Sequence, residues 1–142
     1  MGKVVVPATV TNWRDIEQVA FAERTEPPRS VGFEALVDTG ATGFYLRKGV
    51  IEDLGLRQIG EKFSRTMSAR RETRRLFSPV ELEVQGRRCR VEVMEIPDSL
   101  PNIVGQVPLE MMDWVIDMQG RKLIGNPEHN GEELYEDFSD HV

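Results

Sequence analysis

Apolar and polar residues alternate along most of this chain, and the alternation predicts short β-strands. The clearest run covers residues 31–37, in which every second residue is apolar: Val31, Phe33, Ala35 and Val37. Side chains that alternate with period two are typical of a strand with one buried face. Further apolar runs predict strands at residues 4–10, 44–46, 63–67, 74–84 and 91–94, and a last hairpin at 114–124.

Helices are predicted at only two places. Residues 48–54 have room for one or two helical turns that end at Gly55, and a second short helix is expected from Pro108 to Met112. Residues 12–28 are polar and mixed, end in two prolines, and predict a variable loop. Many short strands with Gly and Pro turns predict one small all-β domain, a closed barrel-like structure with one or two short helices.

Composition narrows the class of protein. The chain has 142 residues, enough for one domain, and its net charge of −6 argues against a general nucleic-acid binder. No apolar run approaches the roughly 20 residues that a membrane helix needs, and the apolar start at residues 4–6 is too short for a signal peptide. Cys89 is the only cysteine, so no internal disulfide forms, and the expected compartment is the cytoplasm.

The charges are unevenly distributed. A basic group occupies one segment of the chain: Lys62, Arg65, Arg70, Arg71, Arg74 and Arg75. An acidic group occupies the end of the sequence: Glu128, Glu132, Glu133, Glu136, Asp137 and Asp140. The simplest interpretation is a solvated hairpin followed by an acidic, mobile tail at residues 128–142.

The candidate chemistry lies where the strand at residues 31–37 ends. The sequence there is Leu-Val-Asp-Thr-Gly-Ala-Thr, which puts the Asp38 carboxylate at the tip of a buried strand. Gly40 frees the backbone for a tight turn. An aspartate in this position is either a structural turn residue or a catalytic group in a low-dielectric setting. A second apolar segment that ends in glycine, Ile103-Val104-Gly105, precedes the second predicted helix.

Together these two motifs resemble the retropepsin-like aspartic proteases, the retroviral-type family with cellular and bacterial members. That family has Asp-Thr/Ser-Gly-Ala/Ser after an apolar strand, and later an apolar-apolar-Gly segment that leads into a short helix. Residues 37–42 match the first motif and residues 103–105 match the second. The match covers about residues 3–126 and implies a protease domain at residues 1–127.

The resemblance implies hydrolysis of peptide bonds by two carboxylates that share a proton. Only one Asp-Thr-Gly is present in this chain, so the second carboxylate must be Asp38 of another copy in a twofold homodimer. In the family, the residues after the aspartate support the loop, here Thr39, Gly40, Ala41 and Thr42. Thr39 would bond across the axis, Thr42 would brace the loop within the subunit, and Ile103, Val104 and Gly105 would pack behind it.

The family covers its substrate with a hairpin flap, and residues 63–77 occupy the corresponding place. The candidate flap and substrate-contacting residues are Met67, Ser68, Ala69, Arg70 and Arg71. Viral flap tips are glycine-rich, whereas this tip has no glycine. We hypothesise that the Arg-rich flap favours acidic substrates or partners, or docks the acidic tail as a cover.

The last hairpin also differs from the simplest viral enzymes. Residues 114–124 resemble the terminal hairpin of cellular retropepsin-like domains of the DNA-damage-inducible type, in which this hairpin builds the dimer sheet. The resemblance therefore predicts that four apolar residues lie at or near a dimer interface: Val115, Ile116, Leu123 and Ile124.

Three functions remain open from the sequence. The leading one is an aspartic endopeptidase that binds extended polypeptide segments as added strands. The second is a dimer of the same fold that binds peptides without cleaving them, and the third is an interaction module that uses its arginines to hold an acidic partner. No cofactor and no metal are expected, because His129 and His141 lack ligands at a suitable spacing, and Cys89 is expected to fill a strand.

Overall fold

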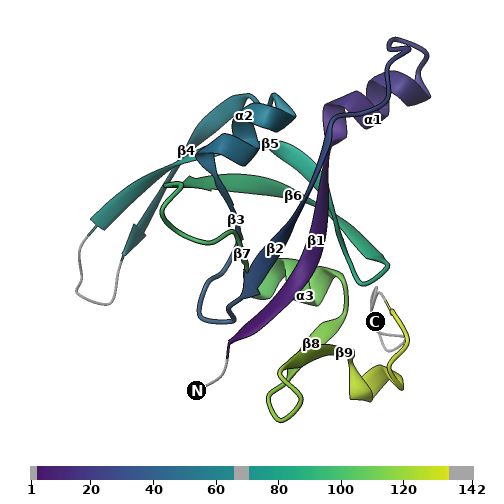
Figure 1. Ribbon diagram of the computed structural model, residues 1–142, viewed down its shortest axis with the longest axis vertical. Helices are drawn as coiled ribbons and strands as arrows, with labels where there is room; N and C mark the ends of the chain where they lie inside the picture. Colours follow the sequence, from purple (N-terminus) through teal and green to yellow (C-terminus); the bar gives the residue numbers. More distant parts are fainter. Residues whose placement is uncertain (1–2, 66–70, 135–142) are drawn as a thin grey trace, which may run out of the picture.

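The computed structural model describes residues 3–65 and 71–134 (Figure 1). Most of this part of the chain is β-strand, as the alternation predicted. The elements follow in the order β1 (Val4–Asn12), α1 (Trp13–Ala20), β2 (Ser30–Val37), β3 (Phe44–Arg47), α2 (Lys48–Leu54), β4 (Gln58–Arg65), β5 (Arg71–Val84), β6 (Arg87–Ile96), β7 (Ile103–Val104), α3 (Gln106–Met111), β8 (Trp114–Asp117), β9 (Lys122–Gly125) and a 3-10 turn (Pro127–His129).

The main sheet is ring-like. Its strands lie in the order β1-β2-β7-β3-β6-β5-β4, and β1 also pairs with β5, so that six strands close on themselves and β4 lies outside the ring. The β4–β5 hairpin projects from one side of this ring (Figure 1). Strands β8 and β9 form a separate two-stranded sheet, which lies with α3 at the end of the molecule opposite to α1. The prediction of a small all-β domain is therefore confirmed.

The core fills the inside of the ring with alternate residues of its strands. In β1 every second side chain is buried, from Val4 to Val10, and β5 contributes three more from Val80 to Val84. Phe44 and Leu46 of β3 are fully buried among them. This explains why few aromatic residues are enough, because branched aliphatic side chains pack well against a pleated surface.

Helix α1 corrects one prediction. Residues 12–28 were expected to be a loop, but residues 13–20 are helical, which gives three α-helices in the described ranges instead of one or two. The buried Asn12 side chain caps this helix by accepting the Asp15 amide (3.1 Å), and its Nδ2 donates to the carbonyl of Leu54 (2.8 Å). No described helix is long and apolar enough to span a lipid bilayer.

Asp15 is a buried charge that anchors the loop after α1. Its carboxylate, 1% exposed, accepts hydrogen bonds from Arg29 Nε (2.8 Å), Nη2 (3.0 Å) and backbone N (3.0 Å). Arg24 Nη1 lies 3.4 Å from the same carboxylate. The hydrogen bonds from Arg29 outweigh the desolvation and hold the pKa of Asp15 below its usual value.

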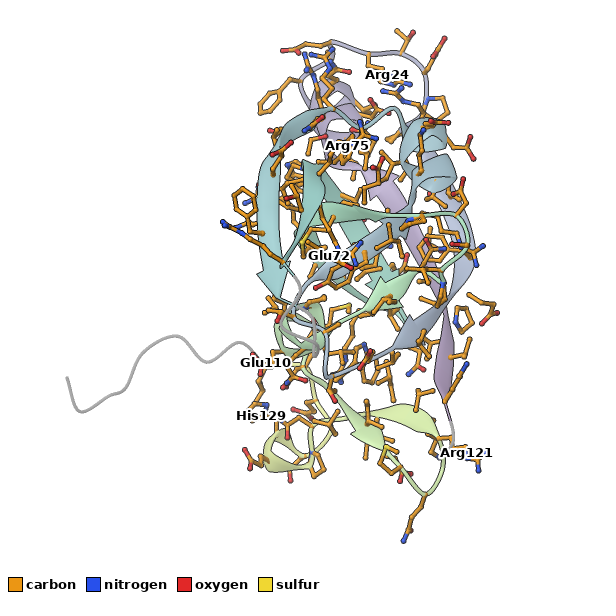
Figure 2. The ribbon with its side chains drawn as sticks, turned by 90° about the vertical axis from the view of Figure 1, so that its left-hand side faces the viewer. Arg24, Glu72, Arg75, Glu110, Arg121 and His129 are labelled. Atoms are coloured by element: carbon orange, nitrogen blue, oxygen red, sulfur yellow. The ribbon has the colours of Figure 1, made fainter. Side chains whose placement is uncertain are left out.

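Asp113 has a comparable role at the other end of the molecule. Its Oδ2 lies 2.6 Å from His129 Nδ1 and accepts the Leu134 amide (3.1 Å), while Arg87 donates to the carbonyl of Gly131 (2.6 Å). Figure 2 shows His129 at the end of the molecule opposite to Arg24. The first residues of the expected acidic tail thus contact the domain up to Leu134, and residues 135–142 lie outside the described part.

We expect Asp15→Asn to lower the free energy of unfolding by about 2 kcal/mol at neutral pH, because it removes the charged partner of two arginines. Since the pKa of Asp15 is lowered in the folded state, its contribution is complete above the unfolded-state pKa of about 4 and is lost as the pH falls through the folded-state pKa. Urea denaturation at several pH values measures this difference. The exposed Asp53→Asn is the matched control, and an equal loss in both variants would contradict the anchoring role.

Candidate active site

Asp38 lies at the rim of the ring, directly after β2. Its backbone amide donates to the carbonyl of Val104 (3.0 Å), which continues the pairing of β2 beyond the last strand residue. Its Oδ1 accepts the amide of Gly40 (2.9 Å), and its carbonyl accepts the amide of Ala41 (3.1 Å). The backbone of the turn is therefore fixed, whereas the Asp38 side chain itself is exposed in the single chain.

Strand β7 holds both sides of this turn. It pairs in parallel with β2 (Leu36 with Ile103) and antiparallel with β3 (Tyr45 with Ile103). Val104 is fully buried behind the turn, between the ends of the two strands. The two sequence motifs, which are far apart in the chain, are thus neighbours in the sheet.

Beyond β7 the backbone contacts continue residue by residue. Gly105 N donates to the carbonyl of Gly43 (2.8 Å), Gln106 N to that of Ala41 (2.8 Å), and Val107 N to that of Thr42 (2.9 Å). A Cβ atom on Gly105 would lie 2.4 Å from the carbonyl oxygen of Gly43 and 2.6 Å from that of Ala41. Only a glycine allows the two backbone segments to approach this closely.

The other predicted loop residues lie at the surface of the turn. Thr39 and Gly40 form its tip and are exposed, as is Thr42, while Ala41 is half-buried. The turn therefore presents the Asp38 carboxylate, Thr39 and Gly40 on one open side of the molecule.

A cleft of about 490 Å³ begins at the same turn. Its walls come from the turn, the strands of the ring and the β4–β5 hairpin: Ala41, Thr42, Gly43, Tyr45, Lys62, Phe63, Glu72, Arg74, Met94, Ile96, Leu100 and Ile103. One side is apolar and the hairpin side carries charges. An extended polypeptide can pair its backbone with strand edges while its side chains fill such a cleft.

Several cleft residues were not predicted from the sequence. Tyr45, Met94 and Leu100 belong to segments that looked like ordinary strands or a loop, and only the folded ring brings them together. The buried Asn102 was also missed. Its Oδ1 accepts the Arg47 amide (2.8 Å) and its carbonyl accepts the Leu36 amide (2.8 Å), which fixes the segment that leads into β7.

The predicted flap tip lies mostly outside the described residues, which holds for Met67, Ser68, Ala69 and Arg70. Arg71 begins β5, and its guanidinium lies 4.3 Å from the ring centroid of Phe63. The β4–β5 hairpin below the tip lines the cleft.

Cys89 is a poor candidate for nucleophilic chemistry. It lies in β6, where it packs against the core opposite Leu82. Burial, and to a smaller extent Glu133 and Glu81, raise the pKa of the Cys89 thiol to about 12, so the thiol is protonated near neutral pH. Within residues 3–65 and 71–134 no three His, Cys, Asp or Glu side chains are grouped so that they could hold a metal ion.

Comparison with known protein families agrees with this geometry. The model of the aspartyl protease family matches residues 29–110, more than half of the chain. This match includes β2, the Asp38 turn, the β4–β5 hairpin, β7 and all of α3 except its last residue. The chain therefore belongs to the aspartyl protease family, which confirms the resemblance to the retropepsin-like type. A search of curated proteins finds no match.

We expect Gly105→Ala to lower the free energy of unfolding by about 1–3 kcal/mol, because the added methyl group must push apart two hydrogen-bonded backbone segments. Thermal and urea denaturation measure the loss. Gly32→Ala in β2 is the control, since its Cβ would lie 3.9 Å from the carbonyl oxygen of Ala8, an ordinary contact. A Gly105→Ala protein as stable as Gly32→Ala would contradict the close approach.

Proposed function

We propose that the chain is an aspartic endopeptidase that acts as a homodimer, with Asp38 of each copy in one catalytic dyad. The observation that carries the proposal is the exposed Asp38 carboxylate on a fixed turn, in which the residues that follow, 41–43, line a cleft that can hold an extended peptide. One such turn supplies one carboxylate. The chemistry needs two, and the open side of the turn leaves room for the second.

The two carboxylates act in different protonation states. Two like charges about 3 Å apart cannot both ionise, so the pair shares one proton. The ionised carboxylate takes a proton from a water molecule, which attacks the peptide carbonyl, while the protonated one donates to the carbonyl oxygen. The tetrahedral intermediate then releases the amine as the C–N bond breaks and the nitrogen is protonated. A shared-proton pair gives a bell-shaped, mildly acidic pH profile.

The residues of the turn would hold the dyad. The Gly40 amide on Oδ1 of Asp38 sets the orientation of the carboxylate and leaves Oδ2 for the water and the partner's carboxylate. Thr39 at the exposed tip is suited to bond across the dimer axis. Because Ile103 also lines the cleft, its proposed packing role extends to contact with the substrate.

The β8–β9 hairpin packs one of its two faces against its own chain. Leu123 is buried in the core and Ile116, directly opposite, packs against it. Val115 and Ile124 form the neighbouring pair, and their side chains point to the other face of the two-stranded sheet. We therefore propose Val115 and Ile124 as the interface residues of this hairpin.

We also propose that the protein is located in the cytoplasm, because it has a single cysteine and therefore no internal disulfide.

A peptide-binding dimer without hydrolysis is the second candidate. The apolar side of the cleft favours it, because Tyr45, Met94 and Ile96 can bind a peptide whether or not the two Asp38 carboxylates are correctly placed. The two candidates share the fold, the dimer and the ligand, and they differ only in the chemistry of Asp38.

We expect Asp38→Asn to reduce cleavage of a mixed peptide library by at least about a hundredfold, because the amide can neither take nor share the proton. Mass spectrometry of the products from about pH 3 to about pH 8 measures this, with sedimentation velocity on the same samples. The control is Asp53→Asn, which removes an exposed carboxylate of α2 and should cleave like the wild type.

Mixing the two proteins tests the shared site. A heterodimer with one Asp38→Asn subunit is inactive, so an excess of this variant should suppress wild-type activity. Full cleavage by a monomeric species, or by Asp38→Asn, would overturn the dyad. A dimeric wild type that binds peptides but cleaves none would favour the second candidate.

A further inference from the structure

We propose that the cleft selects peptide segments in which an apolar side chain has an acidic neighbour, and that Lys62 and Arg74 of the β4–β5 hairpin make this selection. For cleavage, the inference rests on the proposed peptidase function. For recognition, it rests only on the cleft and the charges that line it.

The strand register places the two cations face to face. Lys62 of β4 is directly opposite Arg74 of β5, and both line the cleft. Side chains that are directly opposite in an antiparallel pair have Cβ atoms about 5 Å apart, and like charges in this arrangement destabilise the pair. An anion bound between them removes this repulsion, so the arrangement favours an acidic ligand.

Glu72 offsets only one of the two charges. Its Oε2 lies 3.0 Å from Arg74 Nη2, and the two side chains are 38% and 23% exposed. No carboxylate of the described residues lies within ion-pair distance of Lys62, which is exposed at the mouth of the cleft. The charged side of the cleft therefore has an excess of one positive charge, in a chain whose net charge is −6.

Two other arginines of the hairpin have described side chains, and both are engaged elsewhere. Arg75 donates to both carboxylate oxygens of Glu95 (2.9 and 2.6 Å), and Arg71 stacks on Phe63. Alternation along β5 puts residues 71, 73 and 75 on its exposed face and residues 72, 74 and 76 on the less exposed face. Figure 2 shows Glu72 and Arg75 at separate places on the hairpin. Among the basic side chains of the hairpin that the structure describes, Lys62 and Arg74 are therefore the two that line the cleft.

The apolar side of the cleft sets the second requirement. This side of the cleft has no ionisable group other than the Tyr45 phenol, and it is formed by Tyr45, Met94, Ile96, Leu100 and Ile103. Neighbouring side chains of an extended peptide point in opposite directions. When one apolar side chain enters this side, the next side chain points toward the hairpin. The low-dielectric wall strengthens the attraction between its carboxylate and Lys62.

The experiment uses pairs of peptides that differ only by Asp or Asn beside an apolar residue, taken from a sequence that the wild type cleaves or, if it cleaves none, from one that it binds. We expect kcat/KM to be about fivefold higher for the Asp peptide, near the upper end for a partly exposed ion pair, and the ratio to fall in high salt. In Lys62→Gln the ratio should approach one, and in Lys62→Glu it should invert. Glu72→Gln should raise it, because Arg74 loses its counter-charge.

Arg75→Gln is the matched control. Like Lys62→Gln, it removes one positive charge from the hairpin, but from the position of β5 next to Arg74 and on the outer face, so the Asp-to-Asn ratio should stay at its wild-type value. A ratio that falls equally in Arg75→Gln and Lys62→Gln would overturn the proposal, since the effect would then come from general electrostatics. A wild-type ratio near one at every position beside the apolar residue would also overturn it.

Binding separates this inference from the peptidase proposal. Fluorescence anisotropy with the same labelled peptides on Asp38→Asn, with and without Lys62→Gln, measures recognition when no bond is broken. If wild type cleaves nothing but the Asp peptide binds about fivefold more tightly in a Lys62-dependent way, the peptidase proposal is wrong and the selection by the cleft is supported. If cleavage occurs without any acidic preference, the selection is wrong and the peptidase proposal is supported.

Discussion

The backbone of the Asp38 turn has no regular strand partner of its own, and every buried amide and carbonyl needs one. The segment from β7 into α3 supplies these partners: Gly105, Gln106 and the residue after it donate to three successive carbonyls of the turn. The two backbone segments lie so close together that a side chain at position 105 would overlap the carbonyl groups of the turn, and for this reason the residue is glycine. The position of the carboxylate, the rim of the cleft and the order of the central strands all depend on it.

The ring of strands around this contact separates a buried core from the exposed residues that carry the candidate function. Its interior is filled by aliphatic side chains and by Phe44, and its closure through β1 and β5 leaves few strand edges. The functional groups lie outside this core: Asp38 on the exposed rim and the charged hairpin above the apolar side of the cleft. A single chain therefore holds its candidate catalytic group in a fixed place without enclosing it.

Three aspartates show how the environment decides the role of a carboxylate. Asp15 and Asp113 each accept several hydrogen bonds, and Arg29 and His129 respectively hold their pKa values below the usual range. Both anchors thus stay ionised as the pH falls into the mildly acidic range expected of a shared-proton dyad, so the two ends of the molecule remain attached where the enzyme would work. Asp38 accepts the amide of Gly40 and stays exposed, which leaves its carboxylate open to chemistry.

The sequence by itself determined most of the strands, the helix that ends at Gly55, the Asp38 turn and the importance of Ile103-Val104-Gly105, because alternation and turn chemistry are local properties. It placed the start of β4 at residue 63 instead of Gln58, and the start of β5 at residue 74 instead of Arg71. It did not reveal α1, whose Asn12 cap is stabilised by the distant Leu54 carbonyl, nor the support that Asn102 gives to β7. Tertiary structure also decided that Lys62 and Arg74 face the cleft while Arg71 and Arg75 do not, and that Leu123 points into its own core. These choices depend on strand register and on which face of each strand is covered. Strand register and the covered face are both set by residues far away in the chain, so a local sequence pattern cannot predict them.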